Sequence, residues 1–131
     1  MDSAADFLSQ INNAYRVGKK EMVTSWSNFR EILANLMKSK GYFEEVSVVK
    51  GDNERKRIEL ILKYGPGGRP SLTKIKRVSK PGRRFYVSAD EIPWPPGGLG
   101  DTIVSTPLGL MVGKEARKKN LGGEVICQIF S

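Results

Sequence analysis

The densest run of candidate ligand-binding side chains lies between residues 69 and 84, where basic residues follow one another without an acidic residue. The basic side chains of this run are Arg69, Lys74, Lys76, Arg77, Lys80, Arg83 and Arg84. Lysine and arginine neutralise phosphates, and hydroxyl groups such as that of Ser79 bond to phosphate or ribose oxygens. The run therefore favours RNA binding, although a basic run by itself is also typical of a solvated surface.

Two aromatic residues, Phe85 and Tyr86, follow this run directly. An exposed aromatic ring can stack on an unpaired base. In a strand, neighbouring side chains point to opposite faces, so only one of the two rings is expected to reach RNA. We expect Tyr86 to be exposed and Phe85 to lie in the core.

A second candidate site is the hydroxyl-rich segment Thr102-Ile103-Val104-Ser105-Thr106-Pro107-Leu108-Gly109. Small and hydroxyl residues allow the backbone to come close to a polyanion, but they are also ordinary turn formers. Glu124, after Gly122 and Gly123, is either a surface charge or a hydrogen-bond acceptor that supports this loop. The residue types alone leave both alternatives open.

A second basic group, in which Glu115 is the only acidic residue, consists of Lys114, Arg117, Lys118 and Lys119. For each of these side chains, phosphate contact and simple surface exposure are equally compatible with the sequence.

Signs of catalysis are absent from the sequence. The chain has no histidine and one cysteine, Cys127, so the usual zinc sites and histidine-based triads cannot be assembled. Cys127 lies in an apolar strand and is expected to be a buried, inert thiol. Gly98-Leu99-Gly100 is not part of a full nucleotide-binding glycine motif. We therefore expect no catalytic residue, no metal and no cofactor, and a protein that is not an enzyme.

The elements that must position these residues follow from hydrophobic periodicity. An amphipathic helix with Phe7, Leu8, Ile11, Ala14 and Tyr15 on one face is expected to end near Gly18. A second helix is predicted from Ser27 to Lys40, with its apolar face formed by Phe29, Ile32, Leu33, Leu36 and Met37. Two strands, Val46 to Lys50 and Arg57 to Tyr64, should follow and meet the helices with one face.

The glycine- and proline-rich segment from Gly65 to Pro70 is a natural boundary. We expect an N-terminal α/β module over residues 1–65 and a C-terminal, mostly β module over residues 66–131. The strands predicted for the second module are Leu72 to Ser79, Arg84 to Ser88, Thr102 to Thr106 and Glu124 to Phe130. With one short helix near Lys114 to Asn120, the fold class is α+β.

Composition agrees with a nucleic-acid partner. The 131 residues include 22 Lys plus Arg and 14 Asp plus Glu, and the resulting net charge of +8 favours a polyanion. No apolar run approaches the roughly 20 residues that a membrane-spanning helix needs. We expect a cytoplasmic protein with no membrane partner.

Several blocks together resemble the ribosomal protein eight family of the bacterial small subunit. The blocks that carry this resemblance are Asp6-Phe7-Leu8, Ala34-Asn35-Leu36, Gly41-Tyr42, Arg77-Val78-Ser79-Lys80-Pro81-Gly82, Gly98-Leu99-Gly100, Val104-Ser105-Thr106 with Gly109, Glu115-Ala116-Arg117, and Leu121-Gly122-Gly123-Glu124. Their order and spacing agree over nearly the whole chain.

The resemblance implies an RNA-binding structural protein that contacts the central domain of the small-subunit (16S) ribosomal RNA and supports its assembly. It also implies neighbouring small-subunit ribosomal proteins as partners and a protein that is monomeric when free, and the family includes members that repress translation of their own operon by binding its messenger RNA. The RNA-binding residues that follow from the resemblance and from the basic groups are Tyr86, Ser105, Thr106, Gly109, Gly123, Glu124, Arg77, Lys80, Arg83, Arg84, Lys114, Arg117, Lys118, Asn12, Ser27 and Asn28.

The chain departs from the family pattern at four of these or neighbouring positions. Pro107 replaces a serine in the hydroxyl loop, which removes a hydroxyl and a backbone donor. Gln10 and Asn12 stand where arginines are usual, and Asn28 stands where a lysine is usual. The expected N-terminal contact is therefore either weaker or relies on amide hydrogen bonds more than on charge.

Two other function classes compete with this interpretation. An RNA-modifying enzyme would use the same basic surface, but the sequence lacks its nucleophile, metal and cofactor motifs. A nonspecific binder of nucleic acid or anionic membranes would need only the charge.

Overall fold

The computed structural model describes residues 3–131, and contacts within the chain divide it into a first unit that ends at Ser71 and a second that begins at Leu72. The segment that follows Tyr64 groups with the first unit because it turns back on itself: Tyr64 pairs with Pro70, and the Gly65 amide donates to the Arg69 carbonyl at 2.7 Å. As a boundary between modules, the division between residues 65 and 66 stays a prediction.

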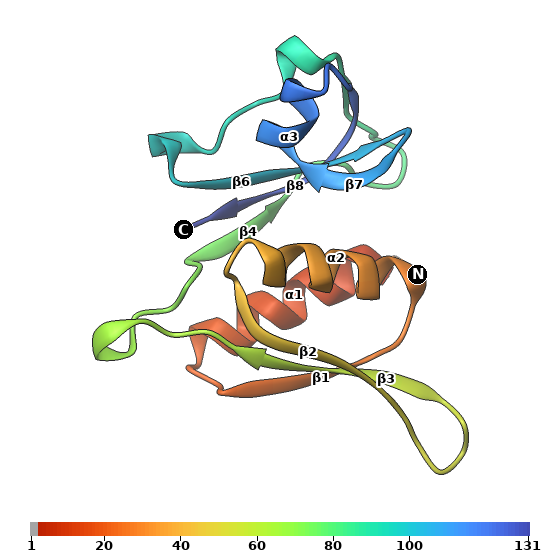
Figure 1. Cartoon of the computed structure of the whole chain (residues 1–131), viewed down its shortest axis with the longest axis vertical. Helices are drawn as coiled ribbons and strands as arrows, with labels where there is room; N and C mark the ends of the chain where they lie inside the picture. Colours follow the sequence, from red (N-terminus) through yellow and green to blue (C-terminus); the bar gives the residue numbers. More distant parts are fainter. Residues whose placement is uncertain (1–2) are drawn as a thin grey trace. The chain divides into compact units, whose positions relative to one another are not determined.

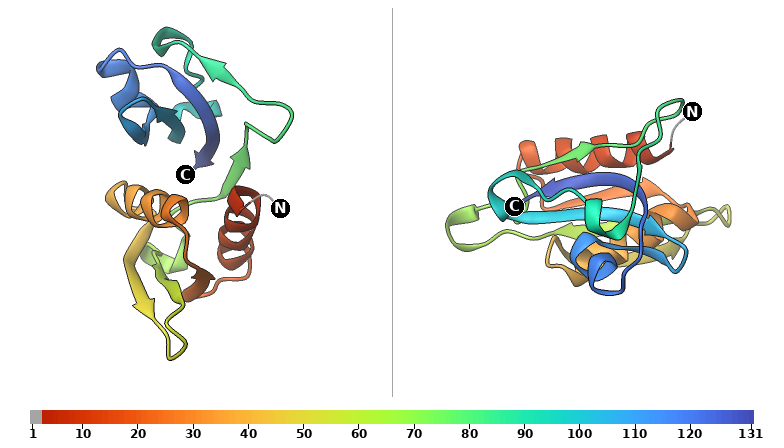
Figure 2. Two further views of the ribbon diagram at one scale, coloured as in Figure 1. Left: turned by 90° about the vertical axis from the view of Figure 1, so that its right-hand side faces the viewer. Right: turned by 90° about the horizontal axis from the view of Figure 1, so that it is seen from above.

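The first unit contains two helices and a three-stranded antiparallel sheet. The helices are α1 (Ser3–Arg16) and α2 (Asn28–Ser39), and the strands are β1 (Glu21–Ser25), β2 (Phe43–Lys50) and β3 (Lys56–Leu62). The strand order is β1-β3-β2, and both helices lie on the same side of this sheet (Figures 1 and 2).

The apolar faces expected for α1 and β3 are confirmed. All five predicted α1 side chains are buried, and on β3 the alternating residues Ile58, Leu60 and Leu62 are buried against the helices. Burial of this apolar surface is what holds the helices to the sheet, because it removes the side chains from water. The serine before α2, Ser27, caps the helix by accepting a hydrogen bond from the Arg30 amide at 3.1 Å.

Two features of the first unit differ from expectation. Strand β1 was not predicted, because only Met22 and Thr24 of its five residues are buried and the strand forms by pairing with the distant β3. In α2, Ile32 was expected in the core but is 44% exposed, whereas Arg30 is buried. The buried stripe of α2 consists of Arg30, Leu33, Ala34 and Met37, so it lies to one side of the predicted stripe.

The second unit is a five-stranded antiparallel sheet with one short helix. Its elements are β4 (Lys74–Arg77), β5 (Tyr86–Val87), β6 (Gly100–Thr106), β7 (Gly109–Val112), α3 (Gly113–Lys118) and β8 (Gly123–Phe130). The strand order is β4-β8-β6-β7, and β5 pairs with the first residues of β8. Strand β7 was not predicted, because it pairs only through the tight turn that follows β6.

The core of the second unit lies between the sheet and α3. Val104 of β6, Met111 of β7 and Ala116 of α3 pack together with Ile92 from the preceding loop. On β8, Val125, Cys127 and Ile129 alternate into the interior. The two units together confirm the α+β class.

Candidate nucleic-acid interface

A tight turn shapes the basic run of the second unit. Lys80 and Arg83 exchange two backbone hydrogen bonds, of 3.2 and 2.9 Å, around Pro81 and Gly82. Gly82 has a φ of +76°, which is the left-handed conformation that a proline-glycine turn requires. The two basic residues that flank this turn, Lys80 and Arg83, are both exposed.

Ser79 serves the fold rather than the surface. Its side chain is buried, and its hydroxyl oxygen accepts a hydrogen bond from the Phe85 amide at 2.9 Å. The backbone amide of Ser79 also donates to the Val125 carbonyl of β8 at 3.2 Å. The expectation that this hydroxyl is among those available to RNA is therefore wrong: Ser79 ties the two ends of the basic loop together.

Five basic side chains line a shallow hollow of about 430 Å³ in this region. They are Lys76, Arg77, Lys80, Arg83 and Arg84, and no acidic residue lines the same hollow. The other lining residues include Phe85, Pro93 and Gln128. A concave surface that carries one sign of charge concentrates a ligand of the opposite sign, here an anion such as phosphate. We call this surface the basic hollow.

The exposure of the two aromatic residues corrects one expectation. Tyr86 is 69% exposed, as expected, but Phe85 is 45% exposed and lines the basic hollow instead of the core. The prediction assumed a strand through both residues, but β5 contains only Tyr86 and Val87, so Phe85 lies before the strand and the alternation rule does not place its ring. Phe85 is thus a candidate stacking residue that the sequence analysis assigned to the interior.

Three predicted site residues form one row across the sheet. Tyr86 of β5 is paired directly with Glu124 of β8, and Glu124 is paired in turn with Ser105 of β6. Directly paired residues of antiparallel strands project from the same face, with Cβ atoms about 5 Å apart. The sheet therefore brings together an exposed ring, a carboxylate and a hydroxyl.

Glu124 also connects this row to the basic hollow. One of its carboxylate oxygens accepts from the Arg84 guanidinium at 3.1 Å, and its side chain is only 17% exposed. A carboxylate repels phosphate, so its place among RNA-facing residues requires another role. The geometry gives one: Glu124 holds the Arg84 side chain between the row and the hollow.

The hydroxyl loop is a two-residue hairpin turn between β6 and β7. The Thr106 hydroxyl donates to the Gly109 carbonyl at 2.8 Å and accepts from the Leu108 amide at 3.1 Å. Pro107 has no amide hydrogen, so neither central residue of the turn offers a free backbone donor. Thr106 is buried and Gly109 has a φ of +115°, so these two residues shape the turn, while Ser105 stays partly exposed.

Gly123 permits the close approach of β6 to β8. A Cβ atom at this position would lie 2.0 Å from the Ser105 carbonyl oxygen, well inside contact distance. The glycine is therefore required by packing at the very place where the row crosses from β8 to β6. This requirement accounts for Gly123 without any contact to a ligand.

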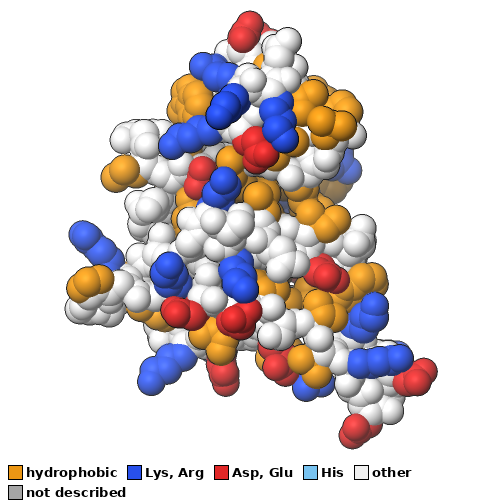
Figure 3. All heavy atoms as spheres, in the orientation of Figure 1, with side chains coloured by type: hydrophobic (Ala, Val, Ile, Leu, Met, Phe, Trp, Pro, Cys, Tyr) orange, Lys and Arg blue, Asp and Glu red, His pale blue; other side chains and the backbone are white. Residues whose placement is uncertain are grey.

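The cations of α3 form a separate group, and none of them lines the basic hollow. Lys and Arg side chains gather over the part of the second unit that α3 occupies (Figure 3). Arg117 packs over the Trp94 ring at 4.9 Å and donates to the Asp90 carbonyl at 2.8 Å, so it fixes the preceding loop to the helix. Lys114 and Lys118 are exposed and lie one turn apart on the helix, where both can reach an anion.

The N-terminal candidates belong to the first unit. The hydroxyl oxygen of Ser27 is used for capping α2, and Asn28 is exposed at the start of that helix. Asn12 is partly buried on α1. Gln10 accepts a hydrogen bond from Thr24 at 2.6 Å, so its amide oxygen joins α1 to β1.

Two kinds of feature are absent from the described residues. No helix in residues 3–131 is long and apolar enough to cross a membrane. Within the same residues, no group of three or more acidic, histidine or cysteine side chains is placed to hold a metal ion.

Comparison with known proteins identifies the family. The family model for ribosomal protein S8 matches residues 2–130. The small ribosomal subunit protein uS8 of Mesorhizobium japonicum is 46% identical over 129 residues, which cover 98% of this chain and 97% of that protein. The proteins of the same name from Syntrophomonas wolfei and Streptococcus pyogenes are 44% and 41% identical over the same coverage. A sheet that aligns Tyr86, Glu124 and Ser105 beside a basic hollow is thus found in a chain that belongs to the ribosomal protein S8 family.

Proposed function

We propose that this chain is a structural protein of the small ribosomal subunit, and that its second unit binds a helix in the central domain of the 16S ribosomal RNA. The observation that carries the proposal is the row of Tyr86, Glu124 and Ser105 next to five cations that line one hollow. A structural component of the ribosome acts in the cytoplasm, and the family is one of ribosomal structural proteins and not of enzymes.

The parts of this surface have different tasks. The cations of the basic hollow neutralise phosphates, which supplies affinity without reading sequence. The exposed Tyr86 ring stacks on an unpaired nucleotide, and the Ser105 hydroxyl bonds to a ribose or base edge. Glu124 does not touch phosphate but keeps Arg84 in place. Thr106, Gly109 and Gly123 set the backbone path that presents Ser105.

Further contacts extend the interface beyond this row. Lys114 and Lys118 of α3 approach phosphates, whereas Arg117 acts mainly through Trp94 and the loop it holds. In the first unit, Asn12, Ser27 and Asn28 make a weaker, amide- and hydroxyl-based contact. The same recognition of a ribosomal-like helix in a messenger RNA would let the free, monomeric protein repress its own operon.

Specificity should reside in the row across the sheet. Tyr86→Ala should weaken binding of the central-domain helix by about 1 to 3 kcal/mol, roughly 5- to 150-fold, because a stacked base is lost. Ser105→Ala should weaken it less, since one hydrogen bond is worth about 1 kcal/mol. Phe85→Ala should weaken binding while leaving the melting temperature nearly unchanged. Titration of the RNA helix into each variant, with a melting curve for each, measures these effects.

Glu124 provides the sharpest comparison because its removal raises the net positive charge. Glu124→Ala should weaken specific binding, and Glu124→Gln should restore part of it, since the amide oxygen still accepts from Arg84. Asp52→Ala is the matched control, because Asp52 lies in an exposed turn of the first unit and makes the same change of charge. If Glu124→Ala and Asp52→Ala both bind as tightly as the parent or more tightly, the positioning role is wrong and general charge accounts for binding.

Added salt should weaken binding, because the counterions that the protein displaces from the RNA phosphates are then released into a solution that already holds more of them, and their release gains less free energy. The log-log slope should have a magnitude of about 0.7 to 0.9 per phosphate contacted, and Arg83→Ala should reduce it by about one contact. Lys19→Ala, in the first unit, should leave the slope almost unchanged. Equal affinity for the ribosomal helix and a scrambled duplex at the same salt would instead support the nonspecific alternative.

A further inference from the structure

The three-stranded sheet of the first unit has a face opposite to the two helices. Three rows of paired residues cross it. In the first row Glu21 and Glu45 flank Ile61, in the second Val23 and Ser47 flank Glu59, and in the third Ser25 and Val49 flank Arg57. Because β1 and β2 pair with β3 on opposite sides, the residues of each row project from the same face.

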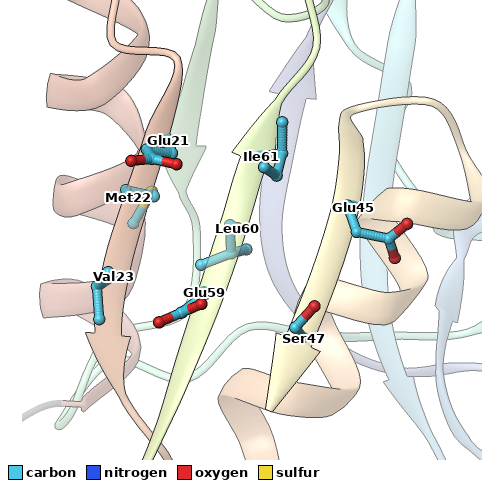
Figure 4. A pocket seen from close by; sticks show the side chains of 8 residues that line it. All are labelled: Glu21, Met22, Val23, Glu45, Ser47, Glu59, Leu60 and Ile61. Atoms are coloured by element: carbon cyan, nitrogen blue, oxygen red, sulfur yellow. The ribbon is translucent and has the colours of Figure 1, made fainter. Parts of the chain in front are cut away.

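These residues line a shallow hollow of about 190 Å³ (Figure 4). Its apolar part is exposed, since Val23 is 56% and Ile61 is 41% accessible to solvent. Aliphatic side chains in a hollow are a surface that a protein partner can cover at a gain in free energy. We call this surface the acidic sheet face.

The charged residues that line the hollow are all acidic, while Arg57 of the third row lies beside the hollow on the same face. Three glutamates and no lysine or arginine line the hollow, in a protein of net charge +8. Lys38 pairs with Glu45 at 2.8 Å and Arg57 pairs with Glu59 at 3.0 Å, while no ion pair of Glu21 is found within residues 3–131. A paired carboxylate keeps further acceptor positions, so all three glutamates remain able to receive donors.

Two other occupants are disfavoured by the same residues. An RNA backbone would bring phosphates against the three carboxylates, and such like-charge contacts cost binding free energy. A metal ion is not supported either, because these glutamates are not among any group of described residues placed to hold one.

We propose that the acidic sheet face docks a basic segment of another protein, with lysine or arginine side chains on the glutamates and one aliphatic side chain in the hollow between Val23 and Ile61. The proposal uses residues that the RNA interface does not use, so either can fail without the other. Complementary charge would select the partner and set its register, and burial of the aliphatic side chain would supply affinity.

The probe is a short synthetic peptide in which lysines flank a single leucine, added to the full-length protein. Amide chemical shifts should change on β1, β2 and β3, and binding should weaken as salt is raised. A peptide with glutamates in place of the lysines should not bind, and one with serine in place of the leucine should bind more weakly. The cognate RNA helix, titrated alone, should leave the amides of Glu21, Val23 and Ile61 unshifted.

Three variants separate this face from general charge. Glu21→Lys should weaken binding of the leucine peptide by about tenfold, because the new lysine repels the lysines of the peptide. Asp52→Lys, with the same change of charge in the turn between β2 and β3, should leave affinity within about twofold of the parent. Val23→Ser should weaken binding of the peptide that contains leucine but not binding of the peptide that contains serine. Any of three results would overturn the proposal. They are peptide-induced amide shifts outside β1, β2 and β3, an equal loss of peptide affinity for Glu21→Lys and Asp52→Lys, and RNA-induced shifts on this face.

Discussion

At the scale of single residues, several side chains of the candidate interface form their hydrogen bonds within the protein and thereby fix the backbone around the binding groups. The Thr106 hydroxyl donates one hydrogen bond and accepts another within the turn. The Ser79 hydroxyl oxygen accepts a hydrogen bond from the Phe85 amide. Gly123 contributes by having no side chain at all. Residue identity at such positions follows from the backbone path that presents the binding groups, and not only from contact with the ligand.

Gly123→Ala should destabilise the second unit by at least about 2 kcal/mol, because its Cβ atom would lie 2.0 Å from the Ser105 carbonyl oxygen and β6 would have to move. Gly51→Ala is a suitable control, since a Cβ atom there meets neighbours only at 3.4 Å or more. Denaturant unfolding of both variants measures the difference. Equal midpoints for the two would show that the sheet absorbs the methyl group without cost.

At the scale of elements, α2 is held by polar groups as well as by its apolar stripe. The buried Arg30 guanidinium donates to Thr24 and to the Ser25 hydroxyl, and Thr24 donates to Gln10. Arg30 also lies 5.7 Å from the centre of the Phe7 ring. Arg30 thereby connects α2 to β1 and α1. It occupies a buried position of the helix at which an aliphatic side chain would be expected.

Arg30→Ala should therefore cost more stability than Ile32→Ala, the reverse of what hydrophobicity suggests. Arg30→Ala should cost about 2 to 4 kcal/mol, because it leaves the buried Thr24 hydroxyl without its donor. Ile32→Ala should cost less than about 1 kcal/mol, since the isoleucine is 44% exposed and alanine favours helix. Thermal and urea unfolding measure both, and a larger loss for Ile32→Ala would contradict the observed position of the helix face.

At the scale of the whole molecule, the ionisation of the Cys127 thiol reports whether the second unit is folded. Cys127 is fully buried on β8, and burial raises the pKa of its thiol to about 12. In the unfolded chain the thiol ionises near its ordinary pKa of 9.0. The protonated thiol is thus favoured by folding, and its contribution is complete below pH 9 and is lost as the pH rises toward 12.

The free energy of unfolding should fall by up to about 1.4 kcal/mol per pH unit from this group between its two pKa values. Cys127→Ala should have a lower stability at pH 7 but a shallower decline above pH 9, while other alkaline groups, including Tyr15, contribute equally to both proteins. Urea unfolding across this pH range measures the two slopes. Parallel slopes, or fast reaction of the native thiol with a disulfide reagent at neutral pH, would contradict the burial of Cys127.

The sequence by itself determined the features that depend on local patterns or on charge. Helical periodicity predicted α1 and α2, alternation predicted β3 and β8, and composition predicted a polyanionic partner. Order and spacing of short blocks predicted the family. The predicted elements were confirmed because helical periodicity and strand alternation have physical causes that act within one turn of helix or one strand, while the polyanionic partner stays a prediction from the net charge.

Only the tertiary structure decided which side chains share a surface. Strands β1 and β7 form through pairing with other strands, so their short sequences do not reveal them. Phe85 and Ile32 are apolar yet exposed, and Arg30 is charged yet buried, because exposure depends on which elements cover a position. The row of Tyr86, Glu124 and Ser105 joins three strands that are far apart in the chain, and their register is set by hydrogen bonds between strands that no local pattern encodes.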